Sequence, residues 1–183
     1  ARHSVVVVPL TIHLGRRSFR DGLVIGTAEL LERAANGGPL PTAASPTAAV
    51  FTGVYEALVR RSDRIVSIHI SGKLSRTARN ARTGSEALMG RSKIEVIDSL
   101  TTSIGLGLLV EAAALAAERG ASLEDIVRIV RAMIPRMYSV FFIETLQFLA
   151  QAGRISQAQA TLGGMLGIKP FLTLEEGDIV PME

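Results

Sequence analysis

Hydroxyl side chains cluster directly after a short run rich in Val and Ile at residues 65–70. Ser71, Ser75 and Thr77 follow this run. The run has the composition of a buried parallel strand, and the apolar residues after it change to helical spacing. Ligands of open α/β sheets collect where a strand passes into a helix, because the helix N-terminus offers free N–H groups and a partial positive charge. The pattern therefore predicts an anion-binding loop at residues 71–77.

A second hydroxyl-bearing loop precedes another predicted helix. Residues 39–46 contain three prolines and also carry Thr42 and Ser45. Ser45 followed by Pro46 is typical of a helix N-cap and a first helical position. We interpret Ser45 as the cap of this helix and Thr42 as a ligand contact. The same alternative applies to Ser71 and Ser75, which could cap a helix without touching a ligand.

Ser71 also lies two residues after His69, which places both side chains on one face of the predicted strand. A serine beside a histidine base could act as a nucleophile in a small-molecule hydrolase or transferase. The sequence shows no Gly-x-Ser-x-Gly elbow and no third member of a triad. Histidine on a buried strand is more commonly a satisfied core residue. This enzyme is therefore the alternative hypothesis, and we name no catalytic residue.

Arginine and lysine provide the charge that a bound anion would need. Arg154 follows a glycine and could either cap a helix or contact a ligand or partner. Lys73, Arg76, Arg79 and Arg82 recur at every third position, so they spread over about half of the circumference of a helix. We interpret these four residues as a solvated basic face, with docking of a partner protein as the alternative.

Composition excludes several classes of function. The chain of 183 residues is 48% hydrophobic and contains no cysteine, which removes disulfides, thiolate metal sites and cysteine nucleophiles and fits a cytoplasmic protein. Its three histidines lack the spacing of a zinc site, so we expect no metal or cofactor. The apolar stretch 104–117 contains Glu111 and is shorter than the roughly 20 residues of a membrane span. A net charge of +3 with few aromatic residues does not indicate nucleic-acid binding.

Predicted strands and helices alternate through the first 134 residues. This order predicts an α/β fold with a parallel sheet that is covered by helices on both faces. Residues 16–22 are predicted to form a polar loop. The strands are expected at residues 5–12, 65–70 and 93–98, and the helices at residues 27–35, 46–58, 74–89, 103–119 and 122–133.

The pattern changes near Pro135. A strand is expected at residues 138–144, helices at 146–152 and from 153 onward, and a hairpin around residues 175–178. We therefore assign residues 1–134 to an N-terminal α/β lobe and residues 135–183 to the start of a second α/β lobe, which we expect to be truncated.

Six segments of the chain form a pattern that is specific in its order, although each segment is weak alone. They are Val8-Pro9-Leu10 with Phe19-Arg20-Asp21-Gly22, the loop from Thr42 to Pro46, Ser67-Ile68-His69-Ile70-Ser71 with Leu74-Ser75 and Thr77, Val96-Ile97-Asp98-Ser99, Glu144-Thr145-Leu146 with Gly153-Arg154-Ile155-Ser156, and Ile168-Lys169-Pro170. In this order the segments resemble the DegV family of bacterial fatty-acid-binding proteins.

The resemblance implies the two-lobed EDD fold, which holds a long-chain fatty acid in a buried apolar pocket between the lobes. It implies that the fatty-acid carboxylate lies on the two strand-to-helix loops and that the chain is a carrier without catalytic residues or cofactors. It further implies a partner, the ATP-binding subunit of a fatty acid kinase, which phosphorylates the presented acid to an acyl phosphate. The implied contacts are Thr42, Ser45, Ser71, Ser75 and Arg154.

The chain departs from the family pattern in the central loop. The paired serines after the strand are Ser71 and Gly72, and the segment Leu-Ser-Gly-Thr carries Arg76 in place of glycine. The family also begins with a strand that would precede Ala1, so we expect that strand to be missing from the first lobe. The departures leave open which hydroxyl meets the carboxylate.

Overall fold

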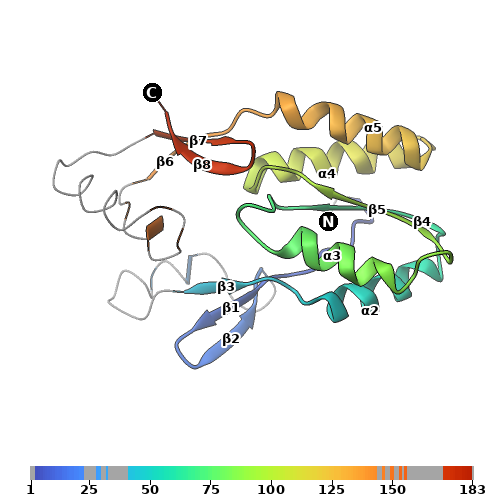
Figure 1. Cartoon of the computed structure of the whole chain (residues 1–183), viewed down its shortest axis with the longest axis horizontal. Coiled ribbons are helices and arrows are strands. Elements are labelled where there is room, and N and C mark those ends of the chain that lie inside the picture. The colour runs from blue at the N-terminus through green and yellow to red at the C-terminus, as the bar shows by residue number, and fades with distance from the viewer. Residues whose placement is uncertain are drawn as a thin grey trace. The chain divides into compact units, whose positions relative to one another are not determined.

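The computed structural model of the chain describes residues 3–22, 28–29, 32, 41–143, 146, 149–150, 153, 155 and 171–182 (Figure 1). The described residues form a mixed α/β structure, which confirms the predicted fold class. They divide into two compact units that are described separately below. The first unit comprises Ala1–Ile65 and Arg79–Ile94, and the second comprises Val66–Ala78 and Glu95–Glu183. The predicted lobe boundary at residue 134 stays a prediction.

The first unit contains a three-stranded antiparallel sheet. Strand β1 (Thr11–Leu14) lies between β2 (Arg17–Arg20) and β3 (Thr42–Ala44). The prediction of a strand at residues 5–12 is wrong for residues 5–10, which are not part of a strand. Pro9 lies in this segment and has no N–H group to donate to a neighbouring strand. The loop predicted at residues 16–22 is wrong as well, because it contains β2.

Helix α2 (Ala48–Val59) and helix α3 (Thr77–Glu86) from Arg79 onward belong to the first unit and pack closely there. Thr47 caps α2, and its Oγ1 accepts a hydrogen bond from Val50 N at 3.4 Å. The prediction that Ser45 caps this helix is therefore wrong. A Cβ on Gly84 of α3 would lie 2.7 Å from the carbonyl oxygen of Ala48, so glycine permits the close approach of the two helices. Phe51 and Tyr55 form the buried face of α2.

Strands β4 (Arg64–His69) and β5 (Lys93–Asp98) pair in a two-stranded sheet, as predicted. Lys93 N donates to Asp63 O at 2.7 Å at the start of the strands, and Ser99 N donates to His69 O at 3.0 Å at their ends. The two strands begin side by side and end side by side, so they are parallel. Their carboxyl ends therefore meet at one edge, as the sequence pattern required.

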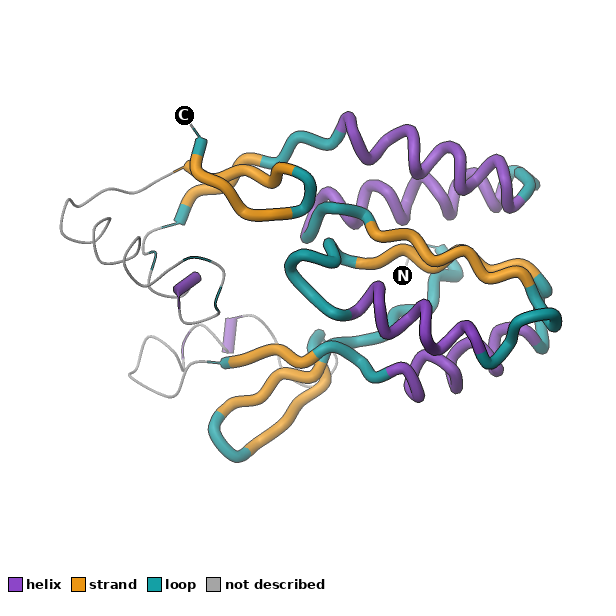
Figure 2. The backbone as a smooth tube through the Cα atoms, viewed as in Figure 1, coloured by secondary structure: helices purple, strands orange, loops and turns teal. Residues whose placement is uncertain are grey.

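Two long helices build the core of the second unit. Helices α4 (Ser103–Glu118) and α5 (Leu123–Met133) lie side by side (Figures 1 and 2) and occur where the sequence predicted them. Ser122 caps α5, because its Oγ accepts a hydrogen bond from Asp125 N at 3.1 Å. A short 3-10 helix η1 (Ile134–Arg136) follows. The core comprises Ile97, Leu109, Ala113, Leu123, Ile126, Val127 and Val130, with Val66 and Ile68 packed against it.

A second antiparallel sheet has the strand order β6-β7-β8 and also belongs to the second unit. Its strands are β6 (Val140–Phe142), β7 (Phe171–Glu175) and β8 (Asp178–Pro181). The turn between β7 and β8 places Glu176 and Gly177 at φ of 48° and 88°, which confirms the predicted hairpin. The helices predicted at residues 27–35, 146–152 and after 153 lie largely or wholly outside the described residues.

Candidate functional site

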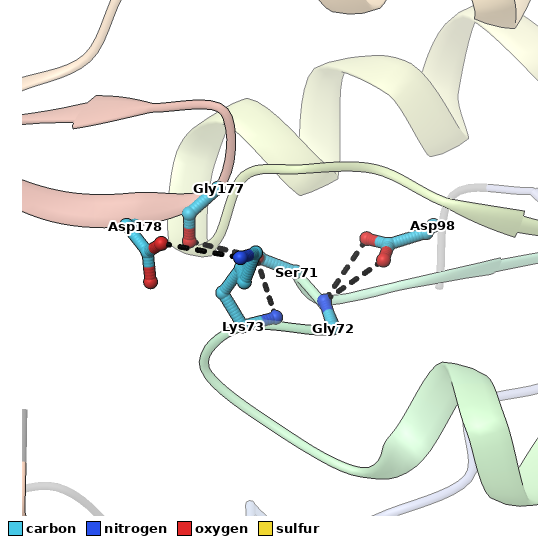
Figure 3. Close-up of polar contacts among 6 residues, drawn as sticks. All are labelled: Ser71, Gly72, Lys73, Asp98, Gly177 and Asp178. Atoms are coloured by element: carbon cyan, nitrogen blue, oxygen red, sulfur yellow. Dashed lines mark hydrogen bonds and ion pairs between the residues drawn. The ribbon is translucent and has the colours of Figure 1, made fainter.

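Hydrogen bonds join the loop after β4 to neighbouring segments through Ser71 and Gly72 (Figure 3). Ser71 is fully buried, and its N–H donates to Thr101 O at 2.8 Å. Its hydroxyl donates to Gly177 O at 2.8 Å and accepts from Lys73 N at 3.2 Å. The N–H groups of Leu74 and Ser75 both donate to Ser71 O at 3.0 Å. Ser71 thus joins its own loop to the loop after β5 and to the β7–β8 turn.

The carboxylate of Asp98 accepts hydrogen bonds from the backbone N–H group that follows Ser71. Gly72 N lies 3.0 Å from both carboxylate oxygens of Asp98, and Leu100 N lies 3.1 Å from Oδ1. A Cβ at position 72 would clash with Asp98 Oδ2, so a serine at this position requires Asp98 to move. Glycine at position 72 therefore permits the close approach of the Asp98 carboxylate. An internal carboxylate therefore already accepts hydrogen bonds from one backbone N–H group of the loop that was predicted to bind an anion.

Ser75 and Thr77 interact with each other at the start of α3. Their hydroxyl oxygens are 2.7 Å apart, and Ser75 Oγ accepts a hydrogen bond from Thr77 N at 3.3 Å. Thr77 is buried and is the first residue of the helix. Ser75 Oγ thus accepts a hydrogen bond at the start of α3, while its role as a cap and its contact with a ligand both stay predictions.

The remaining predicted contacts belong to other parts of the chain. Thr42 is an exposed residue of β3 that pairs with His13, and Ser45 is half-buried between β3 and α2. Both lie in the first unit, whereas Ser71 and Ser75 lie in the second. Arg154 lies outside the described residues. A carboxylate site shared by these residues stays a prediction.

His69 does not pair with Ser71. Its Nε2 lies 2.7 Å from Ser67 Oγ, and its carbonyl oxygen accepts from Ser99 N. The hydroxyl of Ser71 instead contacts Gly177 and Lys73. Since a serine nucleophile needs an adjacent base, the contacts within the described residues do not support the alternative hydrolase or transferase.

Sequence reasoning missed the residues that reach Ser71 from distant segments. Lys73 Nζ lies 3.5 Å from Asp178 Oδ2, and the carbonyl of Gly177 accepts a hydrogen bond from the Ser71 hydroxyl. The hairpin signal located this turn but could not show that it contacts a loop 106 residues away. The hydroxyls of Thr101 and Thr173 are buried and have no hydrogen-bond partner in the described structure.

Two further findings concern the described residues, one on metal-binding clusters and one on apolar helices. Within these ranges no group of three or more His, Asp and Glu side chains is arranged to hold a metal ion. None of the described helices has the length and apolar character of a membrane span.

The parallel β4–β5 pair, its hydroxyl-bearing loop and the covering helices define an α/β protein with a polar site at the strand ends. The chain belongs to the DegV family: the family described as "Uncharacterised protein, DegV family" matches residues 1–183. A DegV domain-containing protein of Caldanaerobacter subterraneus is 35% identical over 177 residues, which are 97% of this chain and 62% of that protein.

Two solved structures extend this comparison. The structure described as fatty acid binding of a DegV family protein from Thermus thermophilus has 35% identity and a TM-score of 0.86, over 96% of this chain and 62% of that one. A stearic acid-binding protein from Eubacterium ventriosum has 25% identity and a TM-score of 0.87, over 100% of this chain and 64% of that one. This chain therefore spans less than two thirds of the length of these relatives.

Proposed function

We propose that this chain binds a long-chain fatty acid, with the acyl tail in a buried apolar pocket and the carboxylate at the strand-to-helix loops. The observation that carries the proposal is the similarity, at 35% identity, to the Thermus thermophilus protein that is described as fatty acid binding. The proposed carboxylate contacts are Thr42, Ser45, Ser71, Ser75 and Arg154. This set combines residues of both units with one residue outside the described ranges.

The acyl tail supplies most of the affinity in this proposal. Burial of about 14 methylenes at roughly 0.8 kcal/mol each is worth on the order of 11 kcal/mol before the costs of association and ordering are subtracted. Such a gain requires only an apolar pocket of the right length. The tail therefore makes little distinction between a fatty acid and another lipid with the same chain.

The carboxylate supplies the specificity. A buried carboxylate is strongly unfavourable unless hydrogen bonds and positive charge compensate it. Serine and threonine hydroxyls together with one arginine provide such compensation, and hydrogen bonds to an ionised group are stronger than those between neutral groups. The buried hydroxyl of Ser71 supports this assignment because it stands at the carboxyl end of a parallel strand.

We further propose that the chain is a cytoplasmic carrier rather than an enzyme. It would present the bound acid to the ATP-binding subunit of a fatty acid kinase, which would form the acyl phosphate. In support of a carrier, Ser71 hydrogen-bonds to a carbonyl and an amide rather than to a base.

A binding titration tests the proposal. The purified chain is titrated with palmitate and, separately, with methyl palmitate, which has the same tail but no ionisable head group. We expect saturable binding of palmitate and at least tenfold weaker binding of the ester. Equal binding of both lipids would contradict the assigned role of the carboxylate, and binding of neither would contradict the proposed function.

A further inference from the structure

The β7–β8 turn is fastened to the loop after β4 by two contacts of different kinds (Figure 3). The Ser71 hydroxyl donates to Gly177 O at 2.8 Å, and Lys73 Nζ lies 3.5 Å from Asp178 Oδ2. We refer to these two contacts together as the turn latch. The hydrogen bond is fully buried, whereas the side chains of the ion pair are 59% and 57% exposed.

The close fit of the turn latch depends on glycine. Gly177 adopts a φ of 88°, a conformation that disfavours other residues. A Cβ at this position would also clash with Ser71 Oγ. The turn therefore lies directly against the serine hydroxyl, with no side chain of its own in between.

The latch determines what Ser71 can offer to a ligand. A serine hydroxyl has one proton to donate and two lone pairs to accept with. The proton of Ser71 is directed to Gly177 O, and one lone pair accepts from Lys73 N. With the latch closed, Ser71 can only accept a further hydrogen bond. A fatty-acid carboxylate, which is ionised at neutral pH, needs donors.

The bound carboxylate and the carbonyl of Gly177 thus compete for the same proton. We propose that the turn latch is closed in the empty protein and opens when the carboxylate of a fatty acid takes the hydrogen bond of Ser71. This inference rests on the proposed function. Opening separates Lys73 from Asp178, so the occupancy of a buried head-group site is transmitted to an exposed turn. Because closing opposes binding, weakening the latch increases the affinity for the fatty acid.

Two matched variants of the turn test the sign of this effect in palmitate titrations. Asp178→Asn removes the charge that pairs with Lys73, and Glu176→Gln makes the same charge change in a residue of the same turn that has no ion pair in the described structure. An exposed ion pair contributes only a small stabilisation, so we expect Asp178→Asn to bind palmitate about two- to fivefold more tightly. Glu176→Gln should bind like the unaltered chain.

Hydrogen exchange of backbone amides reports on the turn directly. We expect amides of residues 171–180 to exchange faster when palmitate is bound, and Gly177→Ala to show fast exchange in this segment even without palmitate. Methyl palmitate, which cannot offer an ionised carboxylate, should leave the exchange of this segment unchanged.

The outcomes separate the latch from the proposed function. Weaker binding by Asp178→Asn, or slower exchange of the turn with palmitate bound, would overturn the latch and make the turn a contact that supports the ligand site. Unchanged affinity together with unchanged exchange would overturn it as well. If the unaltered chain binds no palmitate, the proposed function fails, and the latch fails with it.

Discussion

Replacing Ser71 by alanine should weaken fatty-acid binding and leave the protein folded. The substitution removes a hydroxyl that is fully buried and makes two hydrogen bonds within the loop and to the turn. It creates almost no change in shape. Any effect on binding therefore comes from the lost hydrogen bonds rather than from repacking.

The expected size of the effect follows from the exchange of partners at Ser71. A hydrogen bond to an ionised group contributes about 1.5–3 kcal/mol, and a neutral one about 0.5–1.5 kcal/mol. When the unaltered chain binds the fatty acid, Ser71 gains a hydrogen bond to the ionised carboxylate and loses the neutral one to Gly177 O. Ser71→Ala cannot gain this difference, so its binding free energy should be weaker by about 1 kcal/mol, or roughly fivefold in the dissociation constant.

The folded state should lose stability as well. Alanine removes the hydrogen bond that the buried carbonyl of Gly177 accepts from Ser71, and an unsatisfied buried group costs about 1–3 kcal/mol. This is less than the roughly 5–15 kcal/mol by which domains are usually stable, so the variant should fold with a lower Tm.

Palmitate titration and thermal denaturation of the same samples measure both effects. Ser85→Ala is the matched control, because Ser85 Oγ donates to Arg82 O on an exposed part of α3. We expect its dissociation constant to equal that of the unaltered chain. A Ser71→Ala variant that is less stable but binds palmitate with unchanged affinity would refute the role of Ser71 and move the carboxylate contact to Thr42 or Arg154.

Three further predictions concern the surrounding structure. Gly84→Ala should destabilise the chain by about 1–3 kcal/mol in urea denaturation, because its Cβ would press on Ala48 O and Phe51, whereas Gly53→Ala, with nothing within 4 Å, should be neutral or stabilising. Gly72→Ser should lower the Tm by its clash with Asp98 Oδ2, and the loss should shrink in an Asp98→Ala background. The hydrogen bond from Ser122 is the largest of the causes that lower the pKa of Asp125 in the folded protein. Because the folded-state pKa is the lower one, the ionised carboxylate stabilises the fold above pH about 4, and this stabilisation is lost as the pH falls through the folded-state pKa. Ser122→Ala should therefore reduce the Tm at pH 7 and weaken the decrease of Tm in acid.

Local signals in the sequence were sufficient for much of the second unit. Strands β4 and β5 are short apolar runs, and α5 begins at a serine whose side chain caps it. Each of these features depends on residues within a few positions of one another. Such features can be predicted because the apolar spacing of a strand and the capping residue of a helix each lie within a short stretch of the sequence.

The errors in the first unit have a different origin. Strand β2 is mostly polar and exposed, so its sequence shows no apolar run, and it becomes a strand by pairing with β1 across a turn at Gly15. The choice between Ser45 and Thr47 as cap of α2 was also misjudged. Both residues are typical caps, and only the backbone path after Pro46 decides between them.

The contacts of the candidate site could be predicted only in outline. The hydroxyls of residues 71–77 were identified from their place at a strand end. Their partners were not, because Asp98 and Gly177 lie 26 residues and more than 100 residues further along the chain. Tertiary folding brings these groups together, and nothing in the spacing of the residues indicates which acceptor takes which proton.

Mass spectrometry of the lipid extracted from the purified chain tests fatty-acid binding most directly. The account predicts a long-chain fatty acid in the extract, at a level close to one molecule per chain, or saturable uptake of palmitate after the extracted protein has been refolded. The extract of Ser71→Ala should contain less fatty acid than that of Ser85→Ala. An extract without fatty acid, from a folded chain that also fails to bind added palmitate, would contradict the account.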